Sequence, residues 1–331
     1  MRFKILKQIL SGLLILLLTG IFLMLSPRIW SALNPQKPPT GYHFELAAYL
    51  ALWTGLEKMV NLTPEIPPDI EEFKDIEYKN INGNSLRLDI YKPKNINTPP
   101  PLLVFIHGGS WKGGSRSDYL VYLVDFAERG FITATVSYRL LKDGPYPACA
   151  EDISDAVRWL FSNGSNYGYD PERIALIGGS AGAHLAMLAG YGWGKIPDGE
   201  DTTNVSGSSQ RIKALVNIYG PADLTNEYAR NLPLVTALIA HSYDESPELY
   251  REASPLFYVD KGDPPTLILH GTSDRLVPVS QSDDLKSRLD SLGVPCVYYR
   301  LPLWPHTMDV VRRVNDFCQE KMNKFFEQYL K

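Results

Sequence analysis

The stretch RIALIGGSAG (residues 173–182) runs from an apolar segment into two glycines, a serine, an alanine and a third glycine. The apolar segment is typical of a strand buried on both faces, and AGAHLAMLAGY (181–191) has a helical pattern. A serine at such a turn often does no more than cap the following helix. The alternative is that Ser180 is a nucleophile held on a strained turn, because side chains at positions 178 and 182 would crowd it.

Strands and helices alternate over residues 70–331, which predicts an α/β domain with a mostly parallel central sheet of about eight strands and helices on both faces. An Asn-Gly-Asn turn at 82–84 predicts a hairpin between the first two strands. Residues 221–263 break the alternation, so we expect an insertion after the sixth strand. The expected strands are 76–80, 85–93, 102–107, 131–140, 173–178, 212–220, 266–271 and 296–301, and the expected helices are 117–130, 151–164, 181–191, 283–293 and 309–330.

Polar residues follow three other predicted strands. The loop HGGSW (107–111) follows the third strand, Asp274 the seventh and His306 the eighth. Because the carboxyl ends of parallel strands meet at one edge of a sheet, we expect these residues to gather around Ser180. Together they supply a serine, a carboxylate, an imidazole and a glycine-rich backbone, which are the groups that acyl transfer needs.

Each of these groups has a chemical reason to be present. A serine hydroxyl is a poor nucleophile until a base accepts its proton, and His306 suits this role because imidazole as a chemical group titrates near neutral pH. A carboxylate such as Asp274 fixes the tautomer of that imidazole and stabilises its protonated form. The tetrahedral oxyanion that follows attack needs hydrogen-bond donors already in place.

The order Ser180, Asp274, His306, together with HGGSW, resembles the α/β-hydrolase family. Within it the chain is similar to esterases with an HGG-x-W motif, such as the hormone-sensitive-lipase-like and BD-feruloyl-esterase-like groups. The resemblance covers about residue 72 to the C-terminus. It implies the α/β-hydrolase fold and a serine hydrolase that cleaves carboxylic esters through an acyl-enzyme, without a metal or organic cofactor.

The resemblance also assigns roles to the loop after the third strand. It implies that the oxyanion is bound by the backbone N–H groups of Gly109, Ser110 and Ala181. His107, Gly108 and Trp111 are expected to support this loop, with Trp111 either packing beneath it or lining the acyl pocket.

Other residues compete for these roles. Asp223 follows the sixth strand and is the rival carboxylate, and His241 in the insertion is a rival base. His184 lies one turn into the helix after Ser180, where a structural role is expected. Tyr219 and Trp193 are further candidates for lining the pocket.

Two other functions compete with ester hydrolysis. The first is an amide-directed hydrolase of the exopeptidase-like or arylformamidase-like kind, since HGTSDRLVP (270–278) also resembles a stretch of prolyl-oligopeptidase-like enzymes. The second is a catalytically silent binding module, which is disfavoured because the serine, the acid and the histidine are all present. A covalent serine-hydrolase probe separates the silent module from both enzymes.

Composition excludes several classes of protein. The 331 residues carry a net charge of −4, and no basic stripe occurs, so nucleic acid is not an expected partner. The three cysteines lack the C-x-x-C spacing of a zinc site, so no metal is expected, although one disulfide is compatible with them. The oligomeric state is left open. The expected partners are an ester substrate, either small or lipid-like, and a membrane.

The membrane prediction rests on the N-terminal 33 residues. Residues 8–25 carry no charge, and at about 1.5 Å per residue the apolar run 5–25 is roughly 30 Å long, the thickness of a bilayer core. The residues after the run offer no clean small-residue cleavage site, which favours an uncleaved anchor. The cations Arg2, Lys4 and Lys7, at the N-terminal end, favour residues 70–331 on the non-cytoplasmic side. The alternative is a signal peptide, cleaved to give a secreted or periplasmic protein.

Residues 34–69 join this segment to the catalytic domain. A proline-rich spacer (34–39) is expected to hold the domain off the bilayer. The helical segment 43–59 has an uncharged core too short to span a membrane. It is predicted to pack as an ordinary amphipathic helix on the domain, and the alternatives are that it covers a groove or lies at the membrane surface.

Overall fold

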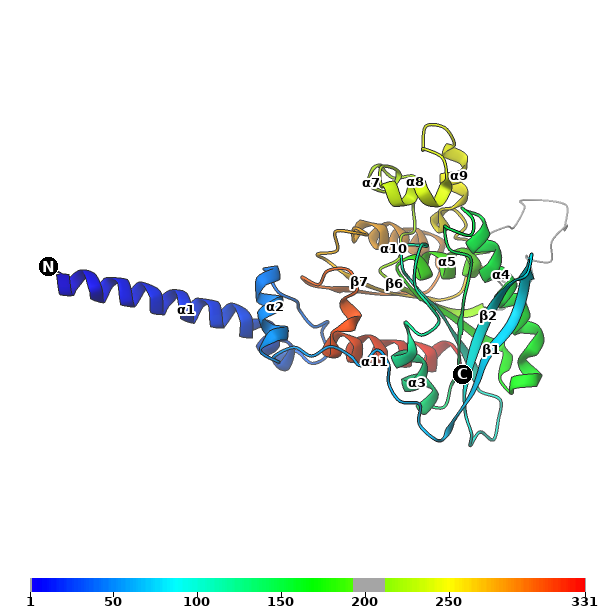
Figure 1. Cartoon of the computed structure of the whole chain (residues 1–331), viewed down its shortest axis with the longest axis horizontal. Helices are drawn as coiled ribbons and strands as arrows, with labels where there is room; N and C mark the ends of the chain where they lie inside the picture. Colours follow the sequence, from blue (N-terminus) through cyan, green and yellow to red (C-terminus); the bar gives the residue numbers. More distant parts are fainter. Residues whose placement is uncertain (1, 193–211, 331) are drawn as a thin grey trace.

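The computed structural model describes residues 2–192 and 212–330 (Figure 1). Trp193, suggested for the pocket, lies outside these ranges. The strands are β1 (Ile70–Ile81), β2 (Asn84–Pro93), β3 (Pro101–Ile106), β4 (Ile132–Val136), β5 (Asp170–Gly179), β6 (Ile212–Ile218), β7 (Thr266–Gly271) and β8 (Cys296–Leu301). The helices are α1 (Arg2–Leu33), α2 (Glu45–Trp53), α3 (Leu120–Glu128), α4 (Ala148–Tyr167), α5 (Ala181–Gly190), α7 (Glu227–Arg230), α8 (Pro233–Ile239), α9 (Pro247–Glu252), α10 (Ser280–Leu292) and α11 (Arg312–Tyr329), with short 3-10 turns η1 (Pro255–Phe257) and η2 (Met308–Val310).

The eight strands form one sheet in the order β1-β2-β4-β3-β5-β6-β7-β8. β1 pairs antiparallel with β2, β2 pairs antiparallel with β4, and every other neighbouring pair is parallel. The predicted α/β-hydrolase architecture, with its hairpin at the start and its insertion after the sixth strand, is therefore confirmed. The insertion consists of α7, α8, α9 and η1 between β6 and β7.

Strand β3 shows why the sheet needs a cover on both faces. Leu103 and Phe105 belong to a core shared with α3 and α11, whereas Leu102, Val104 and Ile106 belong to a core shared with α4 and α5. Since successive side chains of a strand point to opposite faces, an unbroken apolar run is what a central strand requires.

Some predicted boundaries and one predicted alternative differ from the structure. The last helix begins at Arg312 rather than at 309, because residues 308–310 form a 3-10 turn. The disulfide that the cysteine count allowed is absent, since all three cysteines, each within the described chain, are free.

The segment before β1 lies closer to the rest of the chain than expected. The helix in 43–59 is shorter than predicted, because α2 ends at Trp53. The spacer is not free of the domain: the backbone oxygen of Pro39 accepts a hydrogen bond from Trp304 Nε1 at 3.0 Å, and the N–H of Gly41 donates to Pro302 at 2.7 Å. The spacer therefore lies on the loop that carries His306.

Candidate active site

Ser180 occupies a strained turn between β5 and α5. Its φ of 55° and ψ of −123° are uncommon for a residue with a side chain. A Cβ at Gly178 would lie 2.3 Å from the carbonyl carbon of Gly182, and a Cβ at Gly182 would lie 2.0 Å from the oxygen of Ile106. The two glycines are therefore needed because the backbone packs too closely for any side chain there. The Ser180 N–H donates to the oxygen of Ile218 at 2.9 Å, which fixes the turn to β6.

The structure brings Ser180, His306 and Asp274 into one hydrogen-bonded chain. His306 Nε2 lies 3.0 Å from Ser180 Oγ, and His306 Nδ1 lies 2.6 Å from Asp274 Oδ2. An ionised carboxylate only accepts hydrogen bonds, so the imidazole proton lies on Nδ1 and leaves Nε2 free to accept the serine proton. Geometry of this kind is what a nucleophile and its base require.

Asp274 remains ionised because hydrogen bonds outweigh its burial. Burial alone raises the pKa of this carboxyl group, but hydrogen bonds from His270 and His306 hold the pKa well below its usual range. Oδ1 also accepts the N–H groups of Leu276 at 2.9 Å and Val277 at 2.8 Å. The carboxylate of Asp274 is therefore already negatively charged when His306 accepts a proton, and its charge stabilises the protonated imidazole.

The loop after β3 presses against the serine turn. Gly109, Ser110 and Trp111 all have positive φ, of 102°, 59° and 57°. A Cβ at Gly108 would lie 2.8 Å from the oxygen of Gly179, so this glycine permits the close approach.

Backbone donors near the serine are free to bind an anion. Within the described chain, the N–H groups of Gly109 and Ser110 donate to no other residue. Ala181 is the first residue of α5, where the N–H has no preceding helical turn to accept it. Backbone N–H groups in such turns and at helix N-termini suit a negatively charged oxygen.

Two predicted supports of the loop, His107 and Trp111, are buried and hydrogen-bonded. His107 Nδ1 donates to the oxygen of Gly108 at 2.9 Å, and its ring stacks on Tyr138 with centroids 4.4 Å apart. Trp111 Nε1 donates to His184 Nδ1 at 3.2 Å, and His184 Nε2 donates to the oxygen of Ala253 at 2.7 Å. Burial lowers the pKa of His184 to about 4, so it is neutral and fixed in place.

The rival acid and base do not join the serine. Asp223 Oδ1 accepts the N–H of Thr225 at 2.8 Å and its hydroxyl at 2.6 Å, which is a local turn contact. His241 is exposed. In the ranges that the structure describes, neither is hydrogen-bonded to Ser180 or His306.

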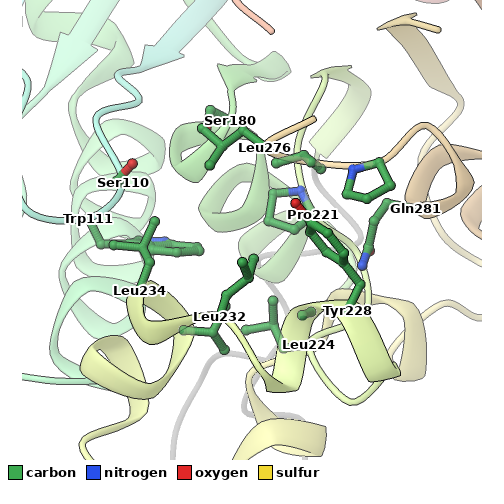
Figure 2. A pocket seen from close by; sticks show the side chains of 14 residues that line it. Ser110, Trp111, Ser180, Pro221, Leu224, Tyr228, Leu232, Leu234, Leu276 and Gln281 are labelled. Atoms are coloured by element: carbon green, nitrogen blue, oxygen red, sulfur yellow. The ribbon is translucent and has the colours of Figure 1, made fainter. Parts of the chain in front are cut away.

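A small apolar cavity of about 30 Å³ lies on one side of Ser180 (Figure 2). Ser180 stands at one end of this cavity, and Leu232 and Leu224 close the other end. Trp111 forms part of the wall, so it both supports the loop and lines the cavity. The insertion supplies much of the rest through Tyr228, Ala229, Leu234 and Val235. We call this the acyl-side cavity.

A larger cavity of about 310 Å³ is also lined by Ser180, together with His306. Its floor is a tyrosine–aspartate cluster: Tyr219 donates to Asp309 Oδ1 at 2.5 Å, and Tyr122 donates to Asp309 Oδ2 at 3.1 Å. Tyr119 also lines this cavity and is buried. Val60 and Leu62, from the segment after α2, form part of the rim. We call this the histidine-side cavity.

Several residues of the site were not predicted from the sequence. His270 is fully buried, with Nε2 3.3 Å from Asp274 Oδ2, and it precedes Asp274 by only four residues, so its position in HGTSD was a usable signal. Tyr119, Tyr122 and Asp309 gave no such signal, because the two tyrosines are far from Asp309 in the sequence and no motif joins them to it. Tyr219 was suggested as a pocket residue, and it lines the histidine-side cavity.

Metal ligands do not cluster in the described part of the chain. No group of three or more His, Cys, Asp or Glu residues there has the geometry to hold an ion.

Comparison with known proteins places this geometry among esterases. The BD-FAE family model matches residues 88–289. Esterase LipC of Mycobacterium tuberculosis is 33% identical over 68% of this chain, and Esterase LipQ of the same organism is 31% identical over 83%. The chain spans 57% and 66% of the lengths of these two relatives.

A solved structure shows the same fold. The thermophilic esterase Est2 of Thermogutta terrifontis superposes with a TM-score of 0.66 at 24% identity, covering 79% of this chain and 92% of that protein. Structures of the same esterase with butyrate and with propionate bound are similar to this chain as well.

Proposed function

The chain belongs to the BD-FAE family of α/β-hydrolases, and from this premise we propose that it hydrolyses carboxylic esters with Ser180 as nucleophile, His306 as base and Asp274 as acid partner. One observation carries the proposal. The strained Ser180 presents its hydroxyl to His306 at 3.0 Å, while the opposite nitrogen of the ring is held by a buried carboxylate.

Acylation uses each group once. His306 Nε2 takes the proton of Ser180 Oγ as the oxygen attacks the ester carbonyl carbon. The N–H groups of Gly109, Ser110 and Ala181 stabilise the negative oxygen, and losing one such donor typically costs about 2.7–4 kcal/mol. His306 then returns the proton to the alcohol oxygen, the bond between that oxygen and the carbonyl carbon breaks, and the acyl group stays on Ser180.

Deacylation repeats the sequence with water. His306 takes a proton from a water molecule, whose oxygen attacks the acyl carbon. The second tetrahedral intermediate collapses when the proton passes from His306 to Ser180 Oγ, which releases the carboxylic acid. Asp274 stays ionised throughout and stabilises the protonated imidazole.

The position of His306 distinguishes the two ends of the substrate. The departing alcohol must lie within hydrogen-bond reach of Nε2 to receive its proton. The alcohol therefore belongs in the histidine-side cavity, which contains His306. The acyl chain belongs in the apolar cavity of about 30 Å³, which accommodates only a few carbon atoms. Propionate and butyrate, found with the similar Est2, are of that size.

Labelling with a fluorophosphonate, followed by mass spectrometry of the peptides, tests the nucleophile. We expect one modification, on Ser180, together with loss of p-nitrophenyl acetate hydrolysis in proportion to labelling. Hydrolysis that persists after complete labelling of Ser180, or labelling at another residue, would contradict the proposal. Parallel assays with p-nitrophenyl acetate and acetyl p-nitroanilide separate ester from amide preference, and the ester is expected to be favoured.

For the whole chain we propose three parts: an N-terminal membrane segment (1–33), a connecting segment with α2 (34–69), and the catalytic domain (70–331). Phe3–Leu33 is long and apolar enough to cross a membrane, as an anchor or a signal sequence. Contacts of its C-terminal end support the anchor, since Arg313 of the domain donates to Ser31 Oγ at 3.1 Å and Arg28 lies 3.6 Å from Glu57 of the connecting segment. Cations at the other end of the helix support a non-cytoplasmic catalytic domain.

A further inference from the structure

Helix α2 presents its apolar side chains to the outside of the molecule. Leu46, Tyr49, Leu50 and Trp53 are 69%, 68%, 42% and 84% exposed. Their spacing of three, one and three residues places them on one face of a helix. A surface helix of a water-soluble domain shows the reverse arrangement, with polar residues outward. We call these four residues the α2 face.

The side of α2 that contacts the domain is made of small residues. Ala51 is fully buried, and Ala47 and Ala48 pack partly buried against the core shared with α11. Small side chains let the helix lie close to the domain. The large side chains are thus left outside by the way α2 packs against this core and against the end of α1.

An ion-pair cluster fixes the orientation of α2. Arg313 Nε lies 2.6 Å from Glu57 Oε1, which also accepts the hydroxyl of Tyr42 at 2.8 Å. The same arginine donates to the oxygen of Thr40 at 2.8 Å. The chain after α2 is held as well, because the N–H of Val60 donates to Val310 at 2.9 Å. The α2 face therefore has a set direction relative to the loop of His306.

The exposed part of helix α1 indicates that the α2 face lies next to a lipid bilayer. Residues 3–22 are exposed throughout, and at about 1.5 Å per residue they are roughly 30 Å long. The unbroken exposure ends at residues 23–27, where Met24 packs against the core shared with α11 and Pro27 is buried, and residues 28–30 are exposed again. A bilayer that encloses residues 3–22 thus has its surface where α1 reaches the domain, and α2 lies beside that point (Figure 1).

We propose that the α2 face is a membrane-docking surface that inserts into the interfacial layer of the lipid bilayer spanned by α1. Tyrosine and tryptophan, here Tyr49 and Trp53, are enriched at this depth, where an apolar ring and a polar edge are both satisfied. Docking turns the rim of the histidine-side cavity, with Val60 and Leu62, toward the lipid. If the proposed function holds, the preferred substrates are short-chain esters of amphiphilic alcohols that reside in the membrane.

A depth measurement tests the docking without any reference to catalysis. The full chain, in a Cys296→Ser background, carries a nitroxide at Trp53→Cys or, as control, at Ser162→Cys on the exposed side of α4. In phosphatidylcholine–phosphatidylglycerol vesicles we expect the label at 53 to be relaxed by oxygen and shielded from an aqueous nickel complex, and the label at 162 to behave oppositely. Equal nickel accessibility at both positions would overturn the proposal. So would dipolar broadening at 53 that disappears on dilution with unlabelled protein, since a second copy would then cover the face.

A kinetic comparison tests access to the site. Tyr49→Glu combined with Trp53→Glu changes two exposed side chains, and Ser162→Glu is the matched control. We expect kcat/KM for hexadecyl acetate in vesicles to fall about tenfold or more, as expected when partial burial of an aromatic side chain is lost. Hydrolysis of p-nitrophenyl acetate in solution should be unchanged. Equal loss on both esters, or no loss on either, would overturn lipid-side access, whereas an inactive wild type would reject the proposed function and leave the depth measurement decisive for docking.

Discussion

The two cavities beside Ser180 differ in size, lining and origin. The acyl-side cavity, of about 30 Å³, is apolar and is closed by side chains of the insertion between β6 and β7. The histidine-side cavity, of about 310 Å³, has a tyrosine–aspartate floor and a rim from the N-terminal segment. The serine, the histidine and the loop after β3 follow strands of the central sheet, and Ser180 lines both cavities.

In the proposed mechanism, this difference would make one hydrolytic site selective at both ends of the substrate. The segments that shape the acyl end and the alcohol end are separate in the sequence, so either end can change without moving the nucleophile. The comparison predicts that substitutions in the shared machinery affect every ester, whereas substitutions in one cavity affect only one end of the substrate.

Ser180→Ala should have the largest effect, because hydrolysis of every ester in the proposed mechanism requires attack by Ser180 Oγ. We expect kcat to fall by on the order of 10⁶ for every ester, as for nucleophile removal in a serine protease. The melting temperature should change little, since the turn is shaped by its glycines. A folded variant that keeps a substantial fraction of activity, once contaminating esterase is excluded, would remove Ser180 from the mechanism.

Asp274→Asn should rank second. Asparagine permits the wrong imidazole tautomer, an effect of about 10⁴ in kcat in the serine-protease precedent. Asp223→Asn is the matched control, because in the described part of the chain the hydrogen bonds of the Asp223 carboxylate go to Thr225, and its effect on kcat should be small. Steady-state kinetics of both variants with p-nitrophenyl acetate decide the matter, and the reverse ranking would move the acid to the end of β6.

Leu232→Ala should change selectivity at the acyl end alone. In the wild type, we expect each methylene beyond the capacity of the acyl-side cavity to lower kcat/KM about tenfold or more. The variant should recover hydrolysis of the longer acyl chains. Leu62→Ala, in the histidine-side cavity, is the control and should leave the acyl-length profile unchanged. A flat profile in the wild type, measured with p-nitrophenyl esters from acetate to octanoate, would contradict the assignment of this cavity.

Asp309→Asn should have the smallest effect, visible as a change in pH dependence. Burial raises the pKa of Asp309, and the hydroxyls of Tyr219 and Tyr122 offset this only in part. The folded protein thus binds this proton more tightly than the unfolded chain, so the free energy of unfolding falls as pH rises from about 4 through the pKa of the folded state. Urea unfolding over this range should show a shallower fall in the variant. Identical slopes would show that the carboxyl titrates as an ordinary surface acid.

The parts of the fold with local signals were predictable from the sequence. Apolar runs bounded by glycine or polar turns identified the strands, and three loops at strand ends identified the residues that the structure brings to Ser180. Gly178 and Gly182 could be explained in advance, because the reason for them is steric crowding between backbone atoms. The small difference at the start of α11 arises because a helical pattern does not distinguish its first turn from a 3-10 turn.

The parts that depend on packing between distant segments were not predictable. Asp309 meets Tyr219 and Tyr122 across 90 and 187 residues of sequence, and no periodicity reports such a meeting. The orientation of α2 could not be predicted from the sequence either. Its composition suits packing on the domain or on lipid, and only the burial of Ala51 against the exposure of Trp53 shows which side faces outward.

A crystal structure of the protein inactivated by a p-nitrophenyl phosphonate with a short alkyl group and a bulky alkoxy group tests the central claim most directly. The account predicts phosphorus bonded to Ser180 Oγ and the phosphoryl oxygen against the N–H groups of Gly109, Ser110 and Ala181. The alkyl group should lie in the acyl-side cavity near Leu232, and the alkoxy group should lie beside His306. Attachment to another residue, or an alkyl group beside His306 with the alkoxy group among the side chains of the insertion, would contradict it.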